Sequence, residues 1–386
     1  MNTIDSESQE QFHVSSVRYF PEEWDNKTLL DAVGMKKDLI VAGPFGSNLK
    51  VSDYKDEGIP IIRLQNIDYG KFIDKEIKYI SHEKARELAY HSFRAGDLVL
   101  AKLGDPIGKT CIVPDYFKDG IVVADVVRVR VADGLVDKKF IMYSLNSVAT
   151  KNQLINGAIG STRPRVNLDQ IRDIQILVPP LNEQRKIAAI LSSVDAAIEQ
   201  TDAIIAQTER MKTGLMQELF AKKFDIAKLG DCSFKPEYGY TTSAIFQPVG
   251  PKFIRITDLK DDGVDWASVP HCTCDEYVLK KYLLKPGDII FARIGATTGK
   301  NYLIKENINC IFASYLIRIR CKDMLLPDFL YQFLKTSAYW NQINANKSGR
   351  LKEGINIPLL NGILIPLPSI QEQKKISLIL SSIDER

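Results

Sequence analysis

The feature that most constrains this chain is an internal repeat with a period of nearly half its length. Residues 183–195 read EQRKIAAILSSVD and residues 372–384 read EQKKISLILSSID, so that nine of thirteen positions are identical at an offset of 189 residues. The match continues upstream at the same offset in three further pairs, Gly160 and Gly349, Asn167 and Asn356, and Pro179 and Pro368. A period of this length is far too long for a solenoid unit. The repeat therefore predicts two copies of one domain, each followed by one helix.

Two other blocks repeat at slightly different offsets. Residues 96–104 (GDLVLAKLG) match residues 287–295 (GDIIFARIG), and Ile62-Arg63-Leu64 matches Ile254-Arg255-Ile256. Because the offset drifts by only a few residues, loops vary in length while the order of elements is kept. Between these blocks the two halves differ strongly in sequence.

The helix after the first copy carries a heptad pattern. From Glu183 to Leu219 there is no Pro and only one Gly. At 1.5 Å per residue this helix would be about 55 Å long, too long to be buried in one small domain. Pro179-Pro180 should end the preceding strand, and Asn182 is the expected cap. The residues expected to pair with another helix are Ile187, Leu191, Val194, Ile198, Ile205, Leu215 and Leu219. This spacing is typical of a coiled coil.

The second copy of the helix should begin after a capping Ser369 and present Ile376, Leu380 and Ile383. The repeat offset would place the equivalent of Leu219 near position 408, whereas the sequence ends at Arg386. We therefore expect a second helix about 22 residues shorter than the first. The unpaired part of the first helix, around residues 208–219, is expected to expose apolar surface.

The chain is predicted to be of the α+β class, with two repeated mixed domains. We expect a disordered tail over residues 1–16, a first domain over 17–181, a long helix over 182–221, a second domain over 222–368 and a short helix over 369–386. Short strands are predicted at 59–64, 97–101, 121–131 and 174–178, and helices at 81–89, 138–156 and 328–344.

Composition narrows the class of protein without identifying it. The chain has 386 residues, of which 45% are hydrophobic and 26% charged, as in an ordinary globular protein, and its net charge is +3. There is no apolar stretch of about 20 residues and the first dozen residues are polar, so neither a membrane span nor a signal peptide is predicted. We expect a cytoplasmic protein, in which its six Cys stay free. Cys272 and Cys274 beside His271 lack the second ligand pair of a zinc site, so no metal is predicted.

Enzyme motifs are incomplete throughout. The segment from Gly104 to Thr110 resembles a phosphate loop, but it has three residues between its glycines instead of four and is followed by a strand-like sequence. It is better read as a strand–turn–strand that carries Lys109, either facing phosphates or in solvent. Asp115 and Asp137-Lys138-Lys139 loosely resemble a nuclease core, but the second half has no counterpart. No motif of an adenine methyltransferase or of a Ser or Cys nucleophile is found, so the chain is predicted not to be catalytic.

Donor-rich polar clusters remain at matching places in the two halves. Arg, Gln, Asn and Thr are the residues that read base edges, and Lys and Arg also hold phosphate. In the first half the candidates for DNA binding are Ser47, Asn48, Lys50, Arg63, Gln65, Asn66, Lys102, Lys109, Thr162, Arg163 and Arg165. In the second half they are Thr241, Thr242, Arg255, Thr257, Arg293, Lys300, Arg350 and Lys352. Arg63 and Arg255 lie in predicted strands and could equally be structural ion-pair residues.

This arrangement resembles the specificity subunit of type I restriction–modification systems. The resemblance covers nearly the whole chain. It is carried by Pro21 to Trp24, Phe45-Gly46-Ser47, the block from Ile62 to Ile67, the block from Gly96 to Val99, the block from Gly160 to Pro164 and above all Pro179 to Ile187, which recurs at Pro368 to Ile376.

The resemblance implies two target recognition domains that each read one half of a bipartite DNA site. It implies helices that pair as an antiparallel coiled coil, giving pseudo-two-fold symmetry. Two methyltransferase subunits would dock on the chain and bring S-adenosylmethionine. Two further restriction subunits would bring ATP-driven translocation and cleavage with magnesium. The specificity chain itself would hold no cofactor.

Two other interpretations stay open at this point. One is a coiled-coil scaffold without DNA readout, and the other is a single-chain enzyme that modifies DNA. The missing motifs disfavour the enzyme. If the chain does read DNA, the different loops of the two halves imply an asymmetric target.

Overall fold

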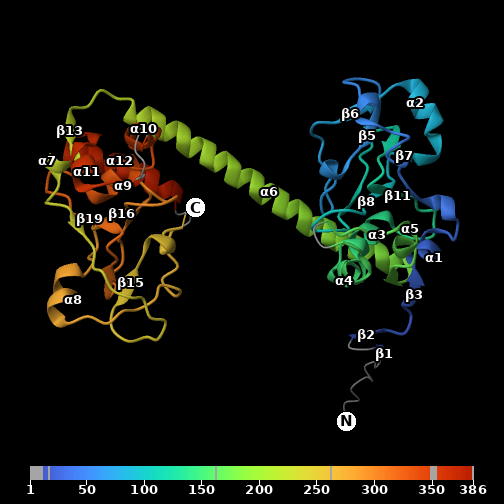
Figure 1. Cartoon of the computed structure of the whole chain (residues 1–386), viewed down its shortest axis with the longest axis horizontal. Coiled ribbons are helices and arrows are strands. Elements are labelled where there is room, and N and C mark those ends of the chain that lie inside the picture. The colour runs from blue at the N-terminus through green and yellow to red at the C-terminus, as the bar shows by residue number, and fades with distance from the viewer. Residues whose placement is uncertain (1–11, 16–17, 161–162, 261–262, 348–353, 385–386) are drawn as a thin grey trace, which may run out of the picture. The chain divides into compact units, whose positions relative to one another are not determined.

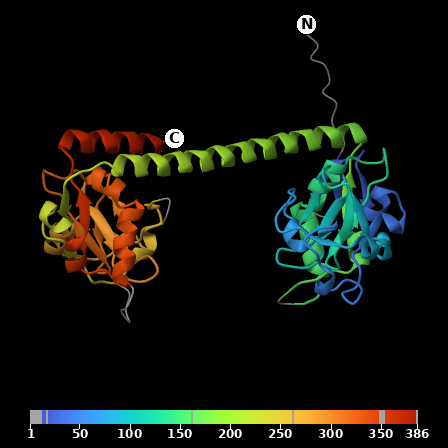
Figure 2. The same cartoon turned by 90° about the horizontal axis from the view of Figure 1, so that it is seen from above.

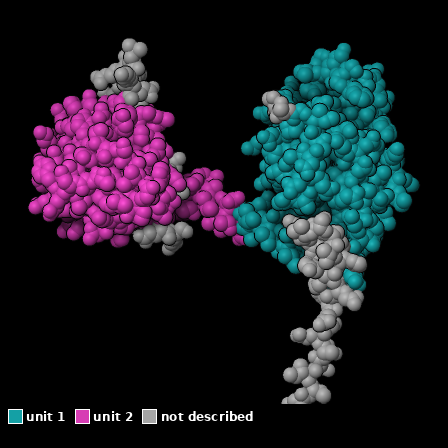
Figure 3. Space-filling view, turned by 60° about the horizontal axis from the view of Figure 1, so that its bottom comes forward, with its two compact units in different colours: residues 1–199 teal, residues 200–386 magenta. Residues whose placement is uncertain are grey.

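The computed structural model describes residues 12–15, 18–160, 163–260, 263–347 and 354–384. The chain divides into two compact units, residues 1–199 and residues 200–386, which Figure 3 shows in two colours. The boundary falls inside the long helix, so each unit contains one copy of the repeated domain and part of that helix.

Unit 1 is built on two four-stranded sheets. One has the order β4-β11-β8-β9, with bounds Ile40–Ala42, Val126–Val129, Leu98–Ala101 and Thr110–Ile112. The other has the order β6-β5-β10-β7, with bounds Lys78–Ile80, Ile59–Ile62, Asp119–Val122 and Ser92–Arg94. In this second sheet β10 and β5 run parallel. A third, two-stranded sheet pairs β12 (Gln175–Val178) with β3 (Asp25–Thr28).

Unit 2 repeats this plan. Its four-stranded sheet has the order β14-β19-β16-β17, with bounds Glu237–Tyr238, Leu316–Ile319, Ile289–Ala292 and Asn301–Leu303. The parallel pair is β15 (Lys252–Ile254) with β18 (Cys310–Phe312), and the antiparallel pair is β13 (Ile226–Lys228) with β20 (Leu364–Pro366). Each of these sheets has its counterpart in unit 1, although among the described residues the pair β15-β18 matches only the central strands, β5 and β10, of a four-stranded sheet. The shared strand order confirms that the sequence repeat is a repeat of fold.

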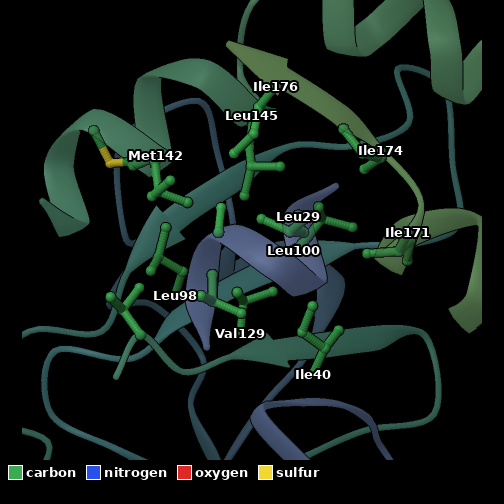
Figure 4. Packing of buried hydrophobic residues seen from close by; sticks show 14 of the residues in the cluster. Leu29, Ile40, Leu98, Leu100, Val129, Met142, Leu145, Ile171, Ile174 and Ile176 are labelled. Atoms are coloured by element: carbon green, nitrogen blue, oxygen red, sulfur yellow. The ribbon is translucent and has the colours of Figure 1, made fainter. Parts of the chain in front are cut away.

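The sheet that contains β8 and β11 is buried on both faces. Successive strand residues point to opposite faces, and Leu98, Val99 and Leu100 are all fully buried. Leu98 and Leu100 pack in the main core of unit 1 against helices, as Figure 4 shows with Leu29 and Leu145. Val99 packs in a different cluster toward the second sheet. The sheet is therefore a rigid base for the loops at its ends.

Short helices cover these sheets. In unit 1 they are α1 (Leu29–Val33), α2 (His82–Glu87), α3 (Lys138–Leu145), α4 (Val148–Gly157) and α5 (Leu168–Arg172). In unit 2 they are α7 (Leu229–Cys232), α8 (Glu276–Tyr282), α9 (Pro327–Phe333), α10 (Ser337–Lys347) and α11 (Ile357–Gly362).

The long helix α6 spans Leu181–Phe220, 40 residues without a break (Figure 1). It begins directly after Pro180, so the expected cap, Asn182, lies inside the helix as its second residue. The Asn182 side chain accepts a hydrogen bond from the N–H of Glu183 at 2.9 Å. The second long helix, α12, spans Ile370–Asp384. Its expected cap is confirmed, because Ser369 Oγ accepts a hydrogen bond from the N–H of Glu372.

Several predicted elements are divided in the structure. The predicted strand 121–131 is two strands in different sheets, β10 and β11, joined by a turn at residues 123–125. The predicted helix 138–156 breaks where Ser147 caps α4 and accepts a hydrogen bond from the N–H of Thr150. The predicted helix 328–344 breaks at Thr336, whose hydroxyl accepts a bond from the N–H of Tyr339. In the two helices a local polar side chain satisfies the backbone where the predicted helix would have continued.

The N-terminal segment also differs from its prediction. Within residues 1–16, where a disordered tail was expected, β1 (Phe12–Ser15) pairs antiparallel with β2 (Arg18–Pro21). The remainder of that segment lies outside the described residues. Within the described part of the chain, every helix falls short of the combined length and apolarity that a membrane span requires.

Candidate DNA interface and helix-pairing surface

Motifs far apart in the sequence meet at one edge of the unit 1 sheet. The strand register pairs Val126 with Ala101 and Leu100 with Thr110, and it pairs Val127 with Ala42. Consequently the end of β4, the start of β11, the end of β8 and the start of β9 lie side by side. The loop that carries Ser47, Asn48 and Lys50 and the segments that carry Lys102 and Lys109 all begin or end at this edge. We call it the loop edge of unit 1.

Arg165, from a segment far along the chain, joins the same edge. Arg165 forms bridges with Leu103 and Ile159, and its guanidinium contacts Asp125 Oδ1 at 2.8 Å. The N–H of Lys102 donates to the carbonyl of the same Asp125 at 3.0 Å. Burial lowers the pKa of Lys102, and the neighbouring charge of Arg165 lowers it further. The loop edge therefore holds two cations against one carboxylate.

Gln65 and Lys109 line a cavity of about 330 Å³ beside this edge. Lys109 Nζ lies 2.9 Å from Asp68 Oδ1 and 5.6 Å from the centre of the Tyr69 ring. The hydrogen bond from Lys109 is the main reason that the pKa of Asp68 is lowered. The strand–turn–strand prediction for this segment is confirmed, but Lys109 is ion-paired and half-buried instead of fully solvated.

Unit 2 builds the same edge with different side chains. The N–H of Arg293 donates to the carbonyl of Tyr315 at 3.0 Å, which is the bond that Lys102 makes to Asp125 in unit 1. Ile294 bridges Gly354 as Leu103 bridges Arg165. The Arg293 guanidinium stacks over the Tyr238 ring at 4.7 Å. Thus an ion-paired cluster in unit 1 corresponds to an arginine–tyrosine cluster in unit 2.

Three other unit 2 candidates, Thr241, Thr242 and Lys300, lie around this loop edge. Thr241 and Thr242 follow Tyr240, which pairs with Ala313 beside the edge. Thr241 is exposed and Thr242 half-buried. Lys300 immediately precedes β17, and its N–H donates to the carbonyl of Thr297.

Three predicted DNA contacts are instead bonded within the protein. Asn66 is fully buried and donates to the carbonyls of Ile73 and Lys75, so its side chain closes a turn and has no exposed edge to read a base. Arg63 ends β5 and donates to the carbonyl of Glu76. Arg255 ends β15 and forms two hydrogen bonds with the Asp258 carboxylate, which raises the pKa of Arg255. For Arg255 the alternative of a structural ion pair holds. Arg63 bonds to a backbone carbonyl and not to a carboxylate, so its role in DNA binding stays a prediction.

The remaining candidates are placed as follows. Ser47, Asn48, Lys50, Arg163 and Thr257 are exposed. Thr162, Arg350 and Lys352 lie outside the described residues. Tyr238, Tyr315 and Asp125 are edge residues that the sequence prediction missed. Tyr315 and Asp125 occupy equivalent positions of the repeat, at an offset of 190 residues. That equivalence could have identified both as edge residues from the sequence.

The two long helices pair antiparallel within unit 2. Lys222 Nζ lies 2.8 Å from Glu372 Oε1 and Lys212 forms an ion pair with Asp384, so residue numbers rise on one helix as they fall on the other. Figure 2 shows α12 alongside the end of α6. The predicted pairing residues Leu215, Leu219, Ile376 and Leu380 all join one core cluster, and Ile383 is half-buried.

The prediction that residues 208–219 are unpaired is therefore wrong. Because the helices are antiparallel, the start of α12 covers the end of α6. The exposed apolar face belongs to the earlier part of α6, where Leu191 is 38% exposed although its repeat counterpart Leu380 is fully buried. The same face continues through Val194, Ile198 and Ile205, while Ile187 is half-buried against the unit 1 core.

The described cysteines are free thiols, most of them buried. Cys272 is buried, and burial raises its pKa to about 11. His271 Nδ1 lies 3.0 Å from the carbonyl oxygen of Gly250. Among the described residues, no three His, Cys, Asp or Glu side chains converge as metal ligands would.

The family is decided by a sequence match over most of the chain. The family described as "Type I restriction modification DNA specificity domain" matches residues 21–210 and 253–386, one region for each repeat. The chain belongs to this family.

Curated relatives agree with this assignment. The chain is 22% identical over 98% of its length to the putative MjaX specificity subunit of Methanocaldococcus jannaschii, of which it covers 90%. It is 23% identical over 92% of its length to the EcoKI specificity subunit of Escherichia coli K12, of which it covers 81%. It is also 26% identical to the MjaVIII specificity subunit of M. jannaschii, in a match that covers 56% of this chain and 50% of that protein.

Solved structures show the same fold. The type I restriction–modification S subunit from M. genitalium superposes with a TM-score of 0.61 at 15% identity, covering 99% of this chain and 91% of that one. A chain from a structural study of type I complex assembly and conformational transition gives a TM-score of 0.53 at 18% identity, covering 95% of this chain and 91% of that one.

Proposed function

We propose that this chain supplies DNA sequence specificity to a type I restriction–modification complex, with each unit reading one half of a bipartite, asymmetric site. The observation that carries the proposal is the loop edge, which recurs in both units on the same backbone hydrogen bonds but with different side chains. Equivalent scaffolds with unlike polar groups are suited to reading two different half-sites.

The chemistry of the edges fits base reading with phosphate contacts. Lys, Arg, Gln and Thr side chains can donate to base edges in the major groove, and Lys and Arg also neutralise phosphates. Since the net charge of the chain is only +3, we expect the isolated chain to bind DNA weakly. Specific binding would then depend on partner subunits that add phosphate contacts.

Those partners are part of the proposal. Two methyltransferase subunits would dock on the chain and bring S-adenosylmethionine for adenine methylation. Two restriction subunits would add ATP- and magnesium-dependent translocation and cleavage. The chain itself would be a non-catalytic, cytoplasmic adaptor, and α6 would set the spacing between the half-sites.

The proposal is tested by adenine methylation in a host that lacks the system. Genomic DNA is sequenced by a method that detects methylated adenine, with the methyltransferase subunit expressed alone or together with this chain. We expect one bipartite motif with unlike halves only when both are present. Methylation without the chain, or at random sites with it, would contradict the proposed function.

A further inference from the structure

The loop edge of unit 2 contains one arginine whose charge the protein leaves uncompensated. Four arginines of the unit 2 domain lie in the described residues: Arg255, Arg293, Arg318 and Arg320. Arg255 pairs with Asp258, Arg320 pairs with Asp288, and Arg318 contacts Glu237 and Asp288. Arg293 has no carboxylate partner among the residues that the structure describes.

The guanidinium of Arg293 is nevertheless held in place. Its face lies over the Tyr238 ring at 4.7 Å, and its Nη1 makes one long contact of 3.4 Å to the carbonyl oxygen of Ser314. The Tyr238 hydroxyl in turn accepts a hydrogen bond of 3.4 Å from the N–H of Ile357. An arginine stacked on an aromatic ring keeps a planar fork of donors with little rotamer freedom left to lose.

Most of the hydrogen-bonding capacity of this fork is unused. Its Nε has no hydrogen-bond partner among the described residues, and the contact to Ser314 is longer than an ordinary hydrogen bond. A half-buried cation with spare donors is costly unless a ligand satisfies it. Its place at the loop edge points to DNA as that ligand.

We propose that Arg293 reads a guanine in the half-site bound by unit 2 and that Tyr238 positions its guanidinium, an inference that rests on the proposed function. Guanine presents the acceptors N7 and O6 in the major groove, and a guanidinium fork pairs with both at once. In unit 1 the equivalent residue is Lys102, which lacks such a fork. The two half-sites therefore differ at the base that this position reads.

The test uses the assembled complex of this chain with its methyltransferase subunits, and the readout is the methylated motif in genomic DNA. R293A and R293K should each relax the preference for one guanine in one half of the motif by roughly 10- to 100-fold and leave the other half unchanged. R293K is decisive because it keeps the charge and nearly the length of the side chain. Y238A should relax the same base less, whereas Y238F, which keeps the ring, should have little effect.

Two controls separate base reading from other roles. K280A removes an exposed positive charge on α8 and should leave the motif intact. In R255K the altered arginine is already bonded to Asp258, so base preference should also be unchanged. A uniform loss of methylation at all sites in R293A, with methylation and motif unchanged in R293K, would show a phosphate contact and overturn the inference. An unchanged guanine preference in both variants, or a wild-type motif without guanine in that half, would overturn it as well. If wild-type complex shows no sequence-specific methylation, the proposed function itself fails.

Discussion

The side-chain Oε1 of Gln373 accepts a hydrogen bond of 2.8 Å from the backbone N–H of Leu326. In unit 1 Gln184 accepts the same bond from the N–H of Asp137 at 2.9 Å. Both glutamines are buried and also donate to the carbonyl of the proline that ends the preceding strand, Pro368 or Pro179. The repeated Glu-Gln motif therefore fastens the start of each long helix to its own domain.

Loss of this fastening should destabilise unit 2. The change Gln373→Ala leaves the N–H of Leu326 buried without its partner, and we expect the free energy of unfolding to fall by about 1–3 kcal/mol. Chemical denaturation followed by circular dichroism measures the loss. Gln371→Ala, an exposed position on the same helix, is the matched control and should change stability by less than about 0.5 kcal/mol. Equal effects of the two changes would contradict this role.

The repeat offers an internal comparison for helix pairing. Leu380 is fully buried against the end of α6, whereas its counterpart Leu191 is 38% exposed. We expect Leu380→Ala to cost about 2–5 kcal/mol of unfolding free energy. Leu191→Ala should cost clearly less, about 1–2 kcal/mol, because part of that side chain stays exposed and no second helix covers it. Denaturant titrations of the two variants decide the point, and similar losses would refute the pairing described for unit 2.

The ion pairs at the end of α12 should make helix pairing depend on pH. Burial alone would raise the pKa of Asp384, but the hydrogen bonds from Lys212 and Gln332 and the charge of Lys335 outweigh it and lower the pKa below its ordinary value of 3.8. A lowered carboxyl pKa means stability that is present above pH 3.8 and is lost as pH falls through the folded-state pKa. Thermal unfolding of Asp384→Asn should therefore differ from wild type at neutral pH, and the difference should shrink in acid. A difference that grows in acid would have the wrong sign.

The length of α6 is predicted to set the distance between half-sites. Inserting four residues near Ile205 adds about one helical turn, or roughly 6 Å. We expect the preferred spacer of the methylated motif to lengthen by about one or two base pairs, since base pairs rise by about 3.4 Å. Methylation-site sequencing of the insertion variant measures the spacer. An unchanged spacer would show that α6 does not act as a ruler.

Much of the fold was predictable because the repeat and the heptads are long-range patterns. The match between residues 183–195 and 372–384 predicts two like units, and the strand orders confirm it. Element boundaries were less predictable, because Ser147 and Thr336 compete locally for backbone hydrogen bonds inside apparently continuous helices. The covered part of α6 was predicted wrongly. It depends on the antiparallel direction of the two helices, and the spacing of apolar residues does not show that direction.

The sequence predicted that basic and polar residues gather at the loop edges, but it did not identify every residue correctly. Lys102, Arg165 and Arg293 do come to the loop edges. Asn66 does not, because a buried amide that closes a turn has the same sequence appearance as one that reads a base. Tyr238 was overlooked because its importance comes from the stacked Arg293, a contact that only the tertiary structure provides.

The central claim, that each unit reads its own half-site, is tested most directly by changing one loop edge and sequencing both halves of the methylated motif. Lys102→Ala and Arg165→Ala together remove the two cations that lie near Asp125 at the unit 1 edge. We predict altered base preference in one half of the motif and an unchanged second half. A change spread over both halves, or no change in either, would contradict the account.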